Sequence, residues 1–286
     1  MELNAAIYDF CADLQLDGRT RSTTRKHNQV LRRLGRWCSA NDLNWQALTP
    51  KQLKAYARET VTEKGHSTRA NTFTTWRLFF AWAVSEGHMP QSPAGEFKTP
   101  RRPVPLPKSL NLEQVEHLRG YLRSCEGRTA RRDEAMLLTS LYAGLRACEL
   151  ARLRWSDVDI RGEVISITLS KMNHGRAVPL HPTLGRELAS WRELQAPDGD
   201  WPCFSLDGKP IVAARAGKIA RRASAGSGVR FTMHMLRHTF ATWALRRSRD
   251  LYAVSKALGH KEIKQTEIYV SADVEYIRAS VTKLYF

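Results

Sequence analysis

Cysteine is scarce in this chain of 286 residues, and the five that occur are scattered, odd in number and never spaced as a C-x-x-C pair. A disulfide framework or a zinc ribbon needs cysteines paired at close spacing, so neither is expected. The chain also lacks an apolar run long enough to cross a bilayer and a signal-peptide pattern. These absences predict a cytoplasmic protein without membrane spans.

Acidic residues are few relative to basic ones. The chain has 45 Lys and Arg against 28 Asp and Glu, a formal net charge of +17. Such a surplus indicates nucleic acid or, less often, an anionic membrane as the partner. The hydrophobic fraction of 42% is ordinary, so the chain can build real cores, and its length suits one large domain or two.

The first hundred residues show the apolar spacing of helices. A helix expected over about residues 22–40 has one apolar side and contains no acid. Its basic residues are Arg25, Lys26, Arg32, Arg33 and Arg36. We expect this side to follow a phosphate backbone, and the alternative is a solvated surface face.

A change of composition marks a domain boundary. Six prolines lie between residues 89 and 108, which excludes a helix or a central strand and predicts a stiff, extended linker. Three basic residues of the linker are candidates for contacts with a nucleic-acid backbone: Arg101, Arg102 and Lys108. The predicted parts are a helical DNA-binding domain over 1–89, the linker over 90–108, and a second domain over 109–286 that ends in an amphipathic segment over 272–286.

Strand signals are confined to the second domain. Residues alternate between apolar and polar over 164–169, a polar turn follows, and a second short run covers 176–179. This pattern predicts an antiparallel hairpin with Lys171 at its tip. The fold class is therefore expected to be mainly α with a small antiparallel β-hairpin or sheet in the second domain.

A helix that begins near Thr232 carries His234, Arg237 and His238 among apolar residues. A helix start favours anions, and arginine offers a planar fork to phosphate oxygens, so this stretch predicts a phosphate pocket. The alternative is that these residues simply cap a core helix. The two histidines have the spacing of a zinc-protease helix, but Met235 replaces the required glutamate, so no metal site is expected.

Several polar residues stand at the ends of predicted elements, where function concentrates. They are Arg146, Glu149, Lys171, His234, Arg237, His260 and Tyr269. The motifs Gly-Leu-Arg146-x-x-Glu149, His234-x-x-Arg237-His238 and Leu-Gly-His260, followed by Tyr269, resemble the tyrosine recombinase (phage integrase) family in order and spacing. The first domain is similar to the family's helical, SAM-like core-binding domain, so the resemblance covers nearly the whole chain.

The resemblance implies a strand-exchange reaction on DNA. Arg146 and Arg237 would offer guanidinium forks to the non-bridging oxygens of a phosphodiester, with His260 as a third donor. Tyr269 would be the nucleophile, which forms a 3′-phosphotyrosyl link and conserves the bond energy, so no ATP is needed.

The remaining groups follow from the same resemblance. His234 would be the proton acceptor, Lys171 the general acid and Glu149 a supporting hydrogen-bond partner. No metal, cofactor or small-molecule substrate is implied. His238 is taken as an ordinary satisfied helix residue. Tyr276 is a rival nucleophile, and Tyr269 is preferred because it lies nine residues after His260.

The family also implies a two-domain, C-shaped clamp around double-stranded DNA at a core recombination site, with two protomers on each site and four in a synapse. Without an arm-binding domain ahead of the first helix, an Xer-like or mobile-element recombinase is expected. The segment over 272–286 docks either on a neighbouring protomer or on its own core, and both remain open. Two rival functions also remain, a nicking–closing enzyme of the type IB topoisomerase kind and a non-catalytic DNA-binding protein.

Overall fold

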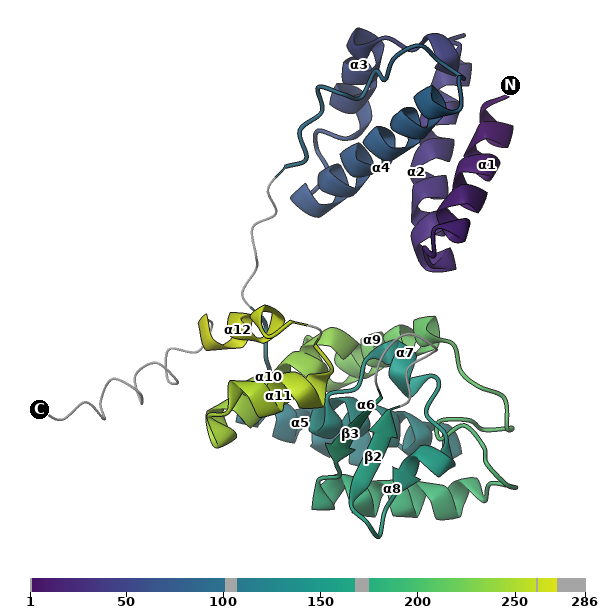
Figure 1. Ribbon diagram of the computed structural model, residues 1–286. Coiled ribbons are helices and arrows are strands. Elements are labelled where there is room, and N and C mark those ends of the chain that lie inside the picture. The colour runs from purple at the N-terminus through teal and green to yellow at the C-terminus, as the bar shows by residue number, and fades with distance from the viewer. Residues whose placement is uncertain (1, 101–106, 168–174, 261, 272–286) are drawn as a thin grey trace, which may run out of the picture. The chain divides into compact units, whose positions relative to one another are not determined.

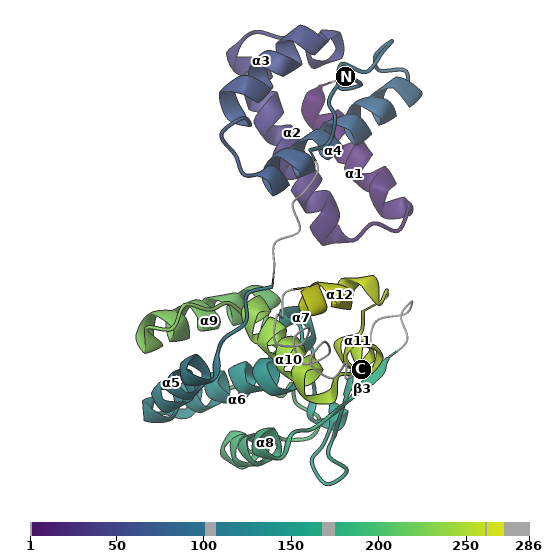
Figure 2. The same cartoon turned by 90° about the vertical axis from the view of Figure 1, so that its left-hand side faces the viewer.

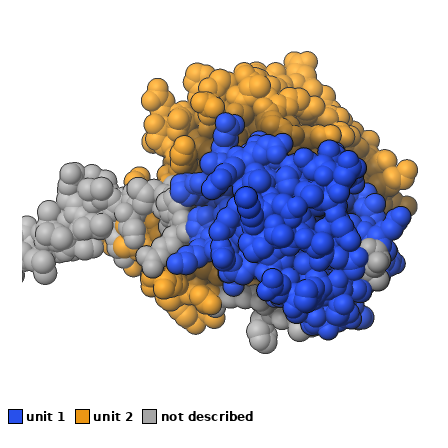
Figure 3. Space-filling model, turned by 90° about the horizontal axis from the view of Figure 1, so that it is seen from above, with its two compact units in different colours: residues 1–104 blue, residues 105–286 orange. Residues whose placement is uncertain are grey.

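The computed structural model describes residues 2–100, 107–167, 175–260 and 262–271 (Figure 1). The chain divides into two compact units, Met1–Val104 and Pro105–Phe286, which Figure 3 colours separately. Within the described ranges, no helix is both long and apolar enough to cross a bilayer.

Unit 1 is entirely helical in its described part and is built around aromatic side chains. Its elements are α1 (Leu3–Leu16), α2 (Arg21–Ala40), a 3-10 turn (Trp45–Ala47), α3 (Pro50–Thr60) and α4 (His66–Ser85). Trp76, Phe79 and Phe80 of α4 are fully buried, and Phe10 of α1 meets the Phe79 ring edge-on at 5.4 Å between centroids. Offset and edge-on pairs of this kind add to the stability that burial provides.

The basic side of α2 is exposed along its whole length. The five predicted basic residues, Arg25, Lys26, Arg32, Arg33 and Arg36, all lie on the solvent side, whereas Leu31, Leu34 and Cys38 are buried. The helix therefore presents its positive charge outward and its apolar side to the core of unit 1.

Unit 2 packs its helices around α6. The elements are α5 (Leu112–Ser124), α6 (Arg128–Ala143), α7 (Ala147–Leu150), a 3-10 turn (Trp155–Asp157), β1 (Val158–Asp159), β2 (Val164–Ile167), β3 (Arg176–Pro179), α8 (Pro182–Gln195), α9 (Ala213–Ser227), α10 (Met233–Ser248), α11 (Leu251–Leu258) and α12 (Lys264–Ser271). Helix α6 contacts α5, α8 and α10, and its residues 132–141 are all buried. A helix covered on all sides is expected at the centre of a domain.

The sheet of unit 2 has three antiparallel strands in the order β1-β2-β3, and Ile165 of β2 pairs with Val178 of β3. The sequence predicted β2 and β3 as a hairpin, whereas β1 has only two residues and shows no alternating pattern. The tip with Lys171 lies outside the described residues. The predicted fold class, mainly α with a small antiparallel sheet, is confirmed.

Helix α12 lies beside α10 and α11 in unit 2 (Figure 2). A small apolar cluster joins the three helices and consists of Ala241, Leu245, Val254, Leu258 and Tyr269. The cluster holds the ring of Tyr269 against the helix that carries His234, Arg237 and His238.

Candidate active site

The start of α10 carries three of the polar residues that the sequence singled out. The Thr232 side chain accepts a hydrogen bond from the backbone N–H of Met235 at 3.2 Å, which caps the helix. His234, Arg237 and His238 follow within the first two turns. Arg237 is buried, His238 is partly buried and His234 is exposed. The start of one helix thus carries three polar groups that differ in their exposure to solvent.

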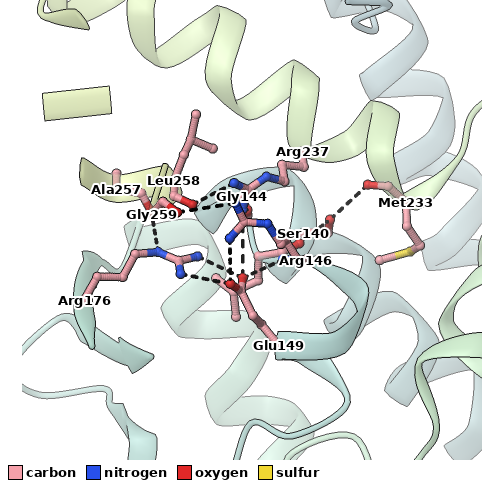
Figure 4. A network of polar contacts seen from close by, with 11 residues as sticks. Ser140, Gly144, Arg146, Glu149, Arg176, Met233, Arg237, Ala257, Leu258 and Gly259 are labelled. Atoms are coloured by element: carbon pink, nitrogen blue, oxygen red, sulfur yellow. Dashed lines mark hydrogen bonds and ion pairs between the residues drawn. The ribbon is translucent and has the colours of Figure 1, made fainter. Parts of the chain in front are cut away.

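Arg237 is fixed by backbone carbonyls. Its Nη1 donates to the Gly144 carbonyl at 2.6 Å and its Nη2 donates to the Leu258 carbonyl at 2.7 Å (Figure 4). These carbonyls lie at the C-terminal ends of α6 and α11, where helix dipoles favour a cation. Burial and the charge of Arg146 lower the pKa of Arg237 to about 10, so the guanidinium stays charged at neutral pH.

Glu149 of α7 is the common acceptor of the site (Figure 4). It receives hydrogen bonds from the backbone N of Arg146 at 2.7 Å and from Arg146 Nη1 at 3.0 Å. Arg176 of β3 binds it with Nη1 and Nη2, each at 2.9 Å, and Arg237 Nη1 lies 3.9 Å from its Oε2. One buried carboxylate thus sets the positions of three guanidinium groups.

The ionisation of Glu149 follows from these contacts. Burial by itself would raise its pKa, but hydrogen bonds from Arg176 and from the Arg146 backbone, with the charges of both arginines, lower it to about 2. The carboxylate is therefore ionised at any pH near neutrality.

Arg146 differs from Arg237 in its access to solvent. It precedes α7, and its Nη2 approaches the Gly259 carbonyl at 3.4 Å, yet 37% of its side chain is exposed against 3% for Arg237. The turn before it requires Gly144, whose φ is +65° and whose Cβ, if present, would lie 2.4 Å from the Phe240 ring. Arg146 is held at its base and open at its tip.

His260 follows α11 and is oriented by a buried hydroxyl. Its Nδ1 and Thr266 Oγ1 are 2.7 Å apart, and Thr266 is completely buried. Burial, with the charges of Arg237, Arg146 and Arg176, lowers the pKa of His260 to about 4. The imidazole is neutral at pH 7 and sits beside concentrated positive charge.

Tyr269 of α12 contacts a residue that the sequence interpretation treated as ordinary. The Tyr269 hydroxyl and His238 Nδ1 are 2.7 Å apart, and the tyrosine is only 2% exposed. Burial raises the pKa of Tyr269, and the charges of Arg237 and Arg146 oppose that rise. Burial, His234 and Arg237 lower the pKa of His238 to about 4, so a neutral imidazole faces a neutral phenol at pH 7.

The structure brings most of the predicted site residues into one region of unit 2. Arg146, Glu149 and Arg237 are linked directly, His260 follows the glycine that Arg146 contacts, and Tyr269 meets the helix of Arg237 through His238. Lys171, Arg101 and Arg102 lie outside the described residues, and Lys108 is exposed in unit 2. The basic residues of α2 belong to unit 1.

Two residues of the site were missed by the sequence analysis. Arg176 follows the hairpin turn, and its role depends on a contact with Glu149 across 27 positions that no local pattern reveals. His238 did carry a signal, because it stands four residues after His234 and therefore on the same side of the helix. Their rings lie 4.1 Å apart.

Taken together, the site combines fixed guanidinium groups, neutral imidazoles and an enclosed phenol. Guanidinium forks bind and polarise the oxygens of a phosphate, and a phenol beside an imidazole is a nucleophile beside a base. This combination fits an attack on a phosphodiester, with its negative charge held by arginine.

Comparisons of the sequence agree with this geometry. A model of the phage integrase family matches residues 108–275, and a model of the phage integrase N-terminal SAM-like domain matches residues 7–87. The tyrosine recombinase XerC of Yersinia pestis is 31% identical over 282 residues, which cover 96% of this chain and 91% of that protein. The tyrosine recombinase XerA of Thermococcus kodakarensis is 29% identical over 285 residues, with 99% and 96% covered.

Solved structures share the fold. The XerH site-specific recombinase bound to a palindromic difH substrate, in a post-cleavage complex, has a TM-score of 0.73 at 20% identity, with 91% of this chain and 79% of that one covered. A lambda integrase tetramer bound to a Holliday junction has a TM-score of 0.75 at 18% identity, with 94% and 77% covered. Because the family model spans more than half of the chain and XerC is similar along nearly all of it, the chain belongs to the phage integrase family of tyrosine recombinases.

Proposed function

We propose that this protein is a site-specific DNA recombinase that cuts and rejoins strands through Tyr269. The observation that carries the proposal is the enclosed Tyr269 hydroxyl, which lies 2.7 Å from His238 on the same helix as the buried Arg237. A nucleophile, an adjacent base and fixed arginines are the parts that phosphoryl transfer to a side chain requires.

In the proposed reaction the phenolic oxygen of Tyr269 attacks the scissile phosphorus and forms a 3′-phosphotyrosyl link. The bond from phosphorus to the 5′ oxygen breaks, and that oxygen leaves as a 5′-hydroxyl. Attack by the 5′-hydroxyl of another strand reverses these steps and frees Tyr269. Because the phosphoryl group stays bound throughout, neither ATP nor another energy source is needed.

The charged groups divide the work between them. Arg146 and Arg237 stabilise the oxygens of the transition state, and His260 provides a third donor. Arg146 makes the first contact with the phosphate, because its tip is exposed while the Arg237 fork is bound to two carbonyls. Glu149 holds both arginines in place, as its contacts with Arg146 and Arg237 support.

Two proton-transfer roles follow from the family resemblance. Lys171 is proposed as the acid that protonates the leaving 5′ oxygen. His234 is the family's candidate for proton acceptor. Reduced hydration, with the charges of Arg237 and Arg146, lowers the pKa of His234, so it is neutral and able to accept a proton at pH 7.

The proposed partner is double-stranded DNA with a core recombination site. The protein is proposed to act on it in the cytoplasm. We propose a helical DNA-binding domain over 1–89, a basic linker over 90–108 and a catalytic domain over 109–286. The exposed arginines of α2 support backbone binding by unit 1. Two protomers on each site and four in a synapse are proposed, in line with the lambda integrase tetramer bound to a Holliday junction.

The test is covalent capture on a nicked substrate, in which the short 5′ fragment diffuses away and traps the adduct. Tyr269→Phe should abolish the adduct, and the matched change Tyr276→Phe should leave it intact. If Tyr269→Phe kept the adduct and Tyr276→Phe lost it, the nucleophile would be Tyr276. A wild-type chain that never forms an adduct would instead be a DNA-binding protein without catalysis. Relaxation of plasmids that lack any specific site would identify a nicking–closing enzyme.

A further inference from the structure

His238 occupies the position next to the reacting atom. Its Nδ1 lies 2.7 Å from the Tyr269 hydroxyl, and the two rings are tilted at 5.4 Å between centroids. His234, which the family resemblance suggests as the base, is exposed and lies beside the His238 ring, 4.1 Å away. The structure therefore separates the two histidines, since His238 contacts the hydroxyl and His234 contacts His238.

The surroundings of His238 keep it neutral and able to accept a proton. His234 and Arg237 face it from α10, Tyr269 faces it from α12, and His260 lies close enough at the end of α11 to interact with it electrostatically. A protonated imidazole beside these groups is disfavoured, so the His238 ring is uncharged. With its proton on Nε2, the ring presents the lone pair of Nδ1 to the phenolic O–H.

We propose that His238 is a catalytic residue whose Nδ1 takes the proton of the Tyr269 hydroxyl as the phenolic oxygen attacks phosphorus. The O–H bond breaks, and its electron pair becomes the new bond from oxygen to phosphorus. The bond from phosphorus to the 5′ oxygen breaks, and that oxygen takes a proton from the general acid. His238 becomes an imidazolium and returns its proton to Tyr269 when the strand is rejoined. This assignment rests on the proposed role of Tyr269 as nucleophile.

The same geometry links proton transfer to the presence of DNA. In the free protein, burial, the neighbouring His234 and the charge of Arg237 oppose protonation of His238. A phosphodiester held by Arg146 and Arg237 brings a negative charge beside these groups, which offsets the arginines and favours the imidazolium. His238 thus becomes a better base when the scissile phosphate is in place, and the enclosed Tyr269 stays unreactive without it.

The first experiment measures single-turnover cleavage of the nicked substrate by the full chain, with the variants His238→Ala and His238→Asn. Asparagine places an oxygen near the position of Nδ1 and accepts a hydrogen bond, but it does not hold a proton. We expect both His238 variants to lose about 10²–10⁴-fold in cleavage rate. Their DNA binding and melting temperature should stay near wild type. Wild-type rate and pH profile in His238→Asn would overturn the proposal.

The second experiment changes the chemistry on each side of phosphorus separately. A 5′-bridging sulfur makes a leaving group that needs no protonation, so it should rescue a loss on the leaving-group side but not His238→Ala. A fluorinated tyrosine at position 269, whose phenol is more acidic, should restore part of the rate of His238→Ala. Rescue by sulfur, or no rescue by fluorination, would overturn the role as proton acceptor.

A third measurement does not depend on the folding of a His238 variant. With His238 intact, the rate for the fluorinated tyrosine should stay flat from about pH 6 to 8, because Nδ1 takes the proton from a neutral phenol. A rate that follows ionisation of the fluorinated phenol would overturn the proposal. Failure of the proposed function has a different signature, since Tyr269→Phe would then keep its adduct whatever occupies position 238.

Discussion

The two units of this protein solve the problem of burial in opposite ways. In the described part of unit 1, the buried polar residues are three threonines, Thr24, Thr72 and Thr75, and the interior is otherwise apolar and largely aromatic. Unit 2 buries five charged side chains within its described ranges, and they are Arg132, Asp133, Glu134, Glu149 and Arg237. Unit 1 keeps charge at its surface, whereas unit 2 builds it into its interior.

This contrast fits the roles proposed for the two units, a binding surface in unit 1 and a reaction site in unit 2. A surface that follows a phosphate backbone needs exposed charge and an apolar core behind it, which is what α2 provides. A reaction site needs charge at fixed positions away from water, where its effect on a transition state is greatest. Burying ions is costly unless each is paired, and the shared carboxylate of Glu149 pairs them.

Part of the buried charge in unit 2 lies away from the site. On α6, Arg132 contacts Asp133 at 2.5 Å, Arg222 of α9 also contacts Asp133, and Arg131 contacts Glu134 at 2.8 Å. These pairs involve none of the proposed catalytic residues. Buried charge alone therefore does not distinguish the proposed site, which differs in that three arginines converge on Glu149.

The strongest test of the contrast is Glu149→Gln. This change leaves Arg176 and Arg237 buried without their carboxylate, so we expect a loss of about 3–5 kcal/mol in the free energy of unfolding of unit 2. Peptide-resolved hydrogen exchange would assign the loss to a unit. The control is Lys54→Ala, which removes the exposed Lys54–Glu96 pair of unit 1 and should change nothing measurable. Equal effects of the two changes would remove the contrast.

Acid should affect unit 2 in two stages. The pKa values of His238 and His260 are about 4, below the ordinary 6.5, so the unfolded state binds protons first. The contribution of each histidine to the free energy of unfolding is therefore fully present above pH 6.5. It falls by about 3 kcal/mol for either histidine as the pH drops toward 4. Glu149 adds a second loss, from pH 4.5 toward 2.

Unit 1 provides the internal comparison for this acid response. Within its described part, His27 is the histidine with a lowered pKa, caused by burial and the charge of Arg19. Hydrogen exchange measured between pH 7 and 4 should therefore show unit 2 weakening more steeply. A steeper loss in unit 1 would contradict the proposed electrostatic origin.

Arg176→Lys should have an intermediate effect. Arg176 binds both oxygens of Glu149 and donates through Nε to the Ala257 carbonyl at 2.7 Å, which an ammonium group does not reproduce. Losing one charge-assisted hydrogen bond predicts about 2 kcal/mol less stability in unit 2. Thermal melts of the full chain, with cleavage rates alongside, would measure it. An unchanged melt would mean that lysine holds Glu149 equally well.

The smallest effect is expected for Trp76→Phe in unit 1. The indole of Trp76 is completely buried, and its Nε1 has no hydrogen-bond partner among the described residues. Removing this unpaired N–H offsets much of the cavity that phenylalanine leaves, so we expect a net change below about 1 kcal/mol. Denaturant unfolding, followed in unit 1 by exchange, would measure it. A loss as large as that of Glu149→Gln would show that aromatic shape dominates unit 1.

Much of the architecture followed from local sequence signals. The capping box of Thr49 and Gln52 and that of Asn111 and Gln114 form as their residue types predict. The polar side of α2 and the start of α10 at Thr232 also follow from patterns among neighbouring residues in the sequence. The strand β1 escaped notice because two residues carry no periodicity.

Some residues of the candidate site could be predicted from short sequence motifs, whereas others are recognised only from contacts between distant parts of the chain. The sequence by itself determined the family, the helical character, and the identity of Arg146, Glu149, Arg237, His260 and Tyr269 as candidates, because each lies in a short motif of fixed spacing. Only the tertiary structure joined Arg176 to Glu149 and His238 to Tyr269. Those contacts span 27 and 31 positions, and they exist because packing of β3, α7, α10 and α12 brings distant side chains within hydrogen-bond distance.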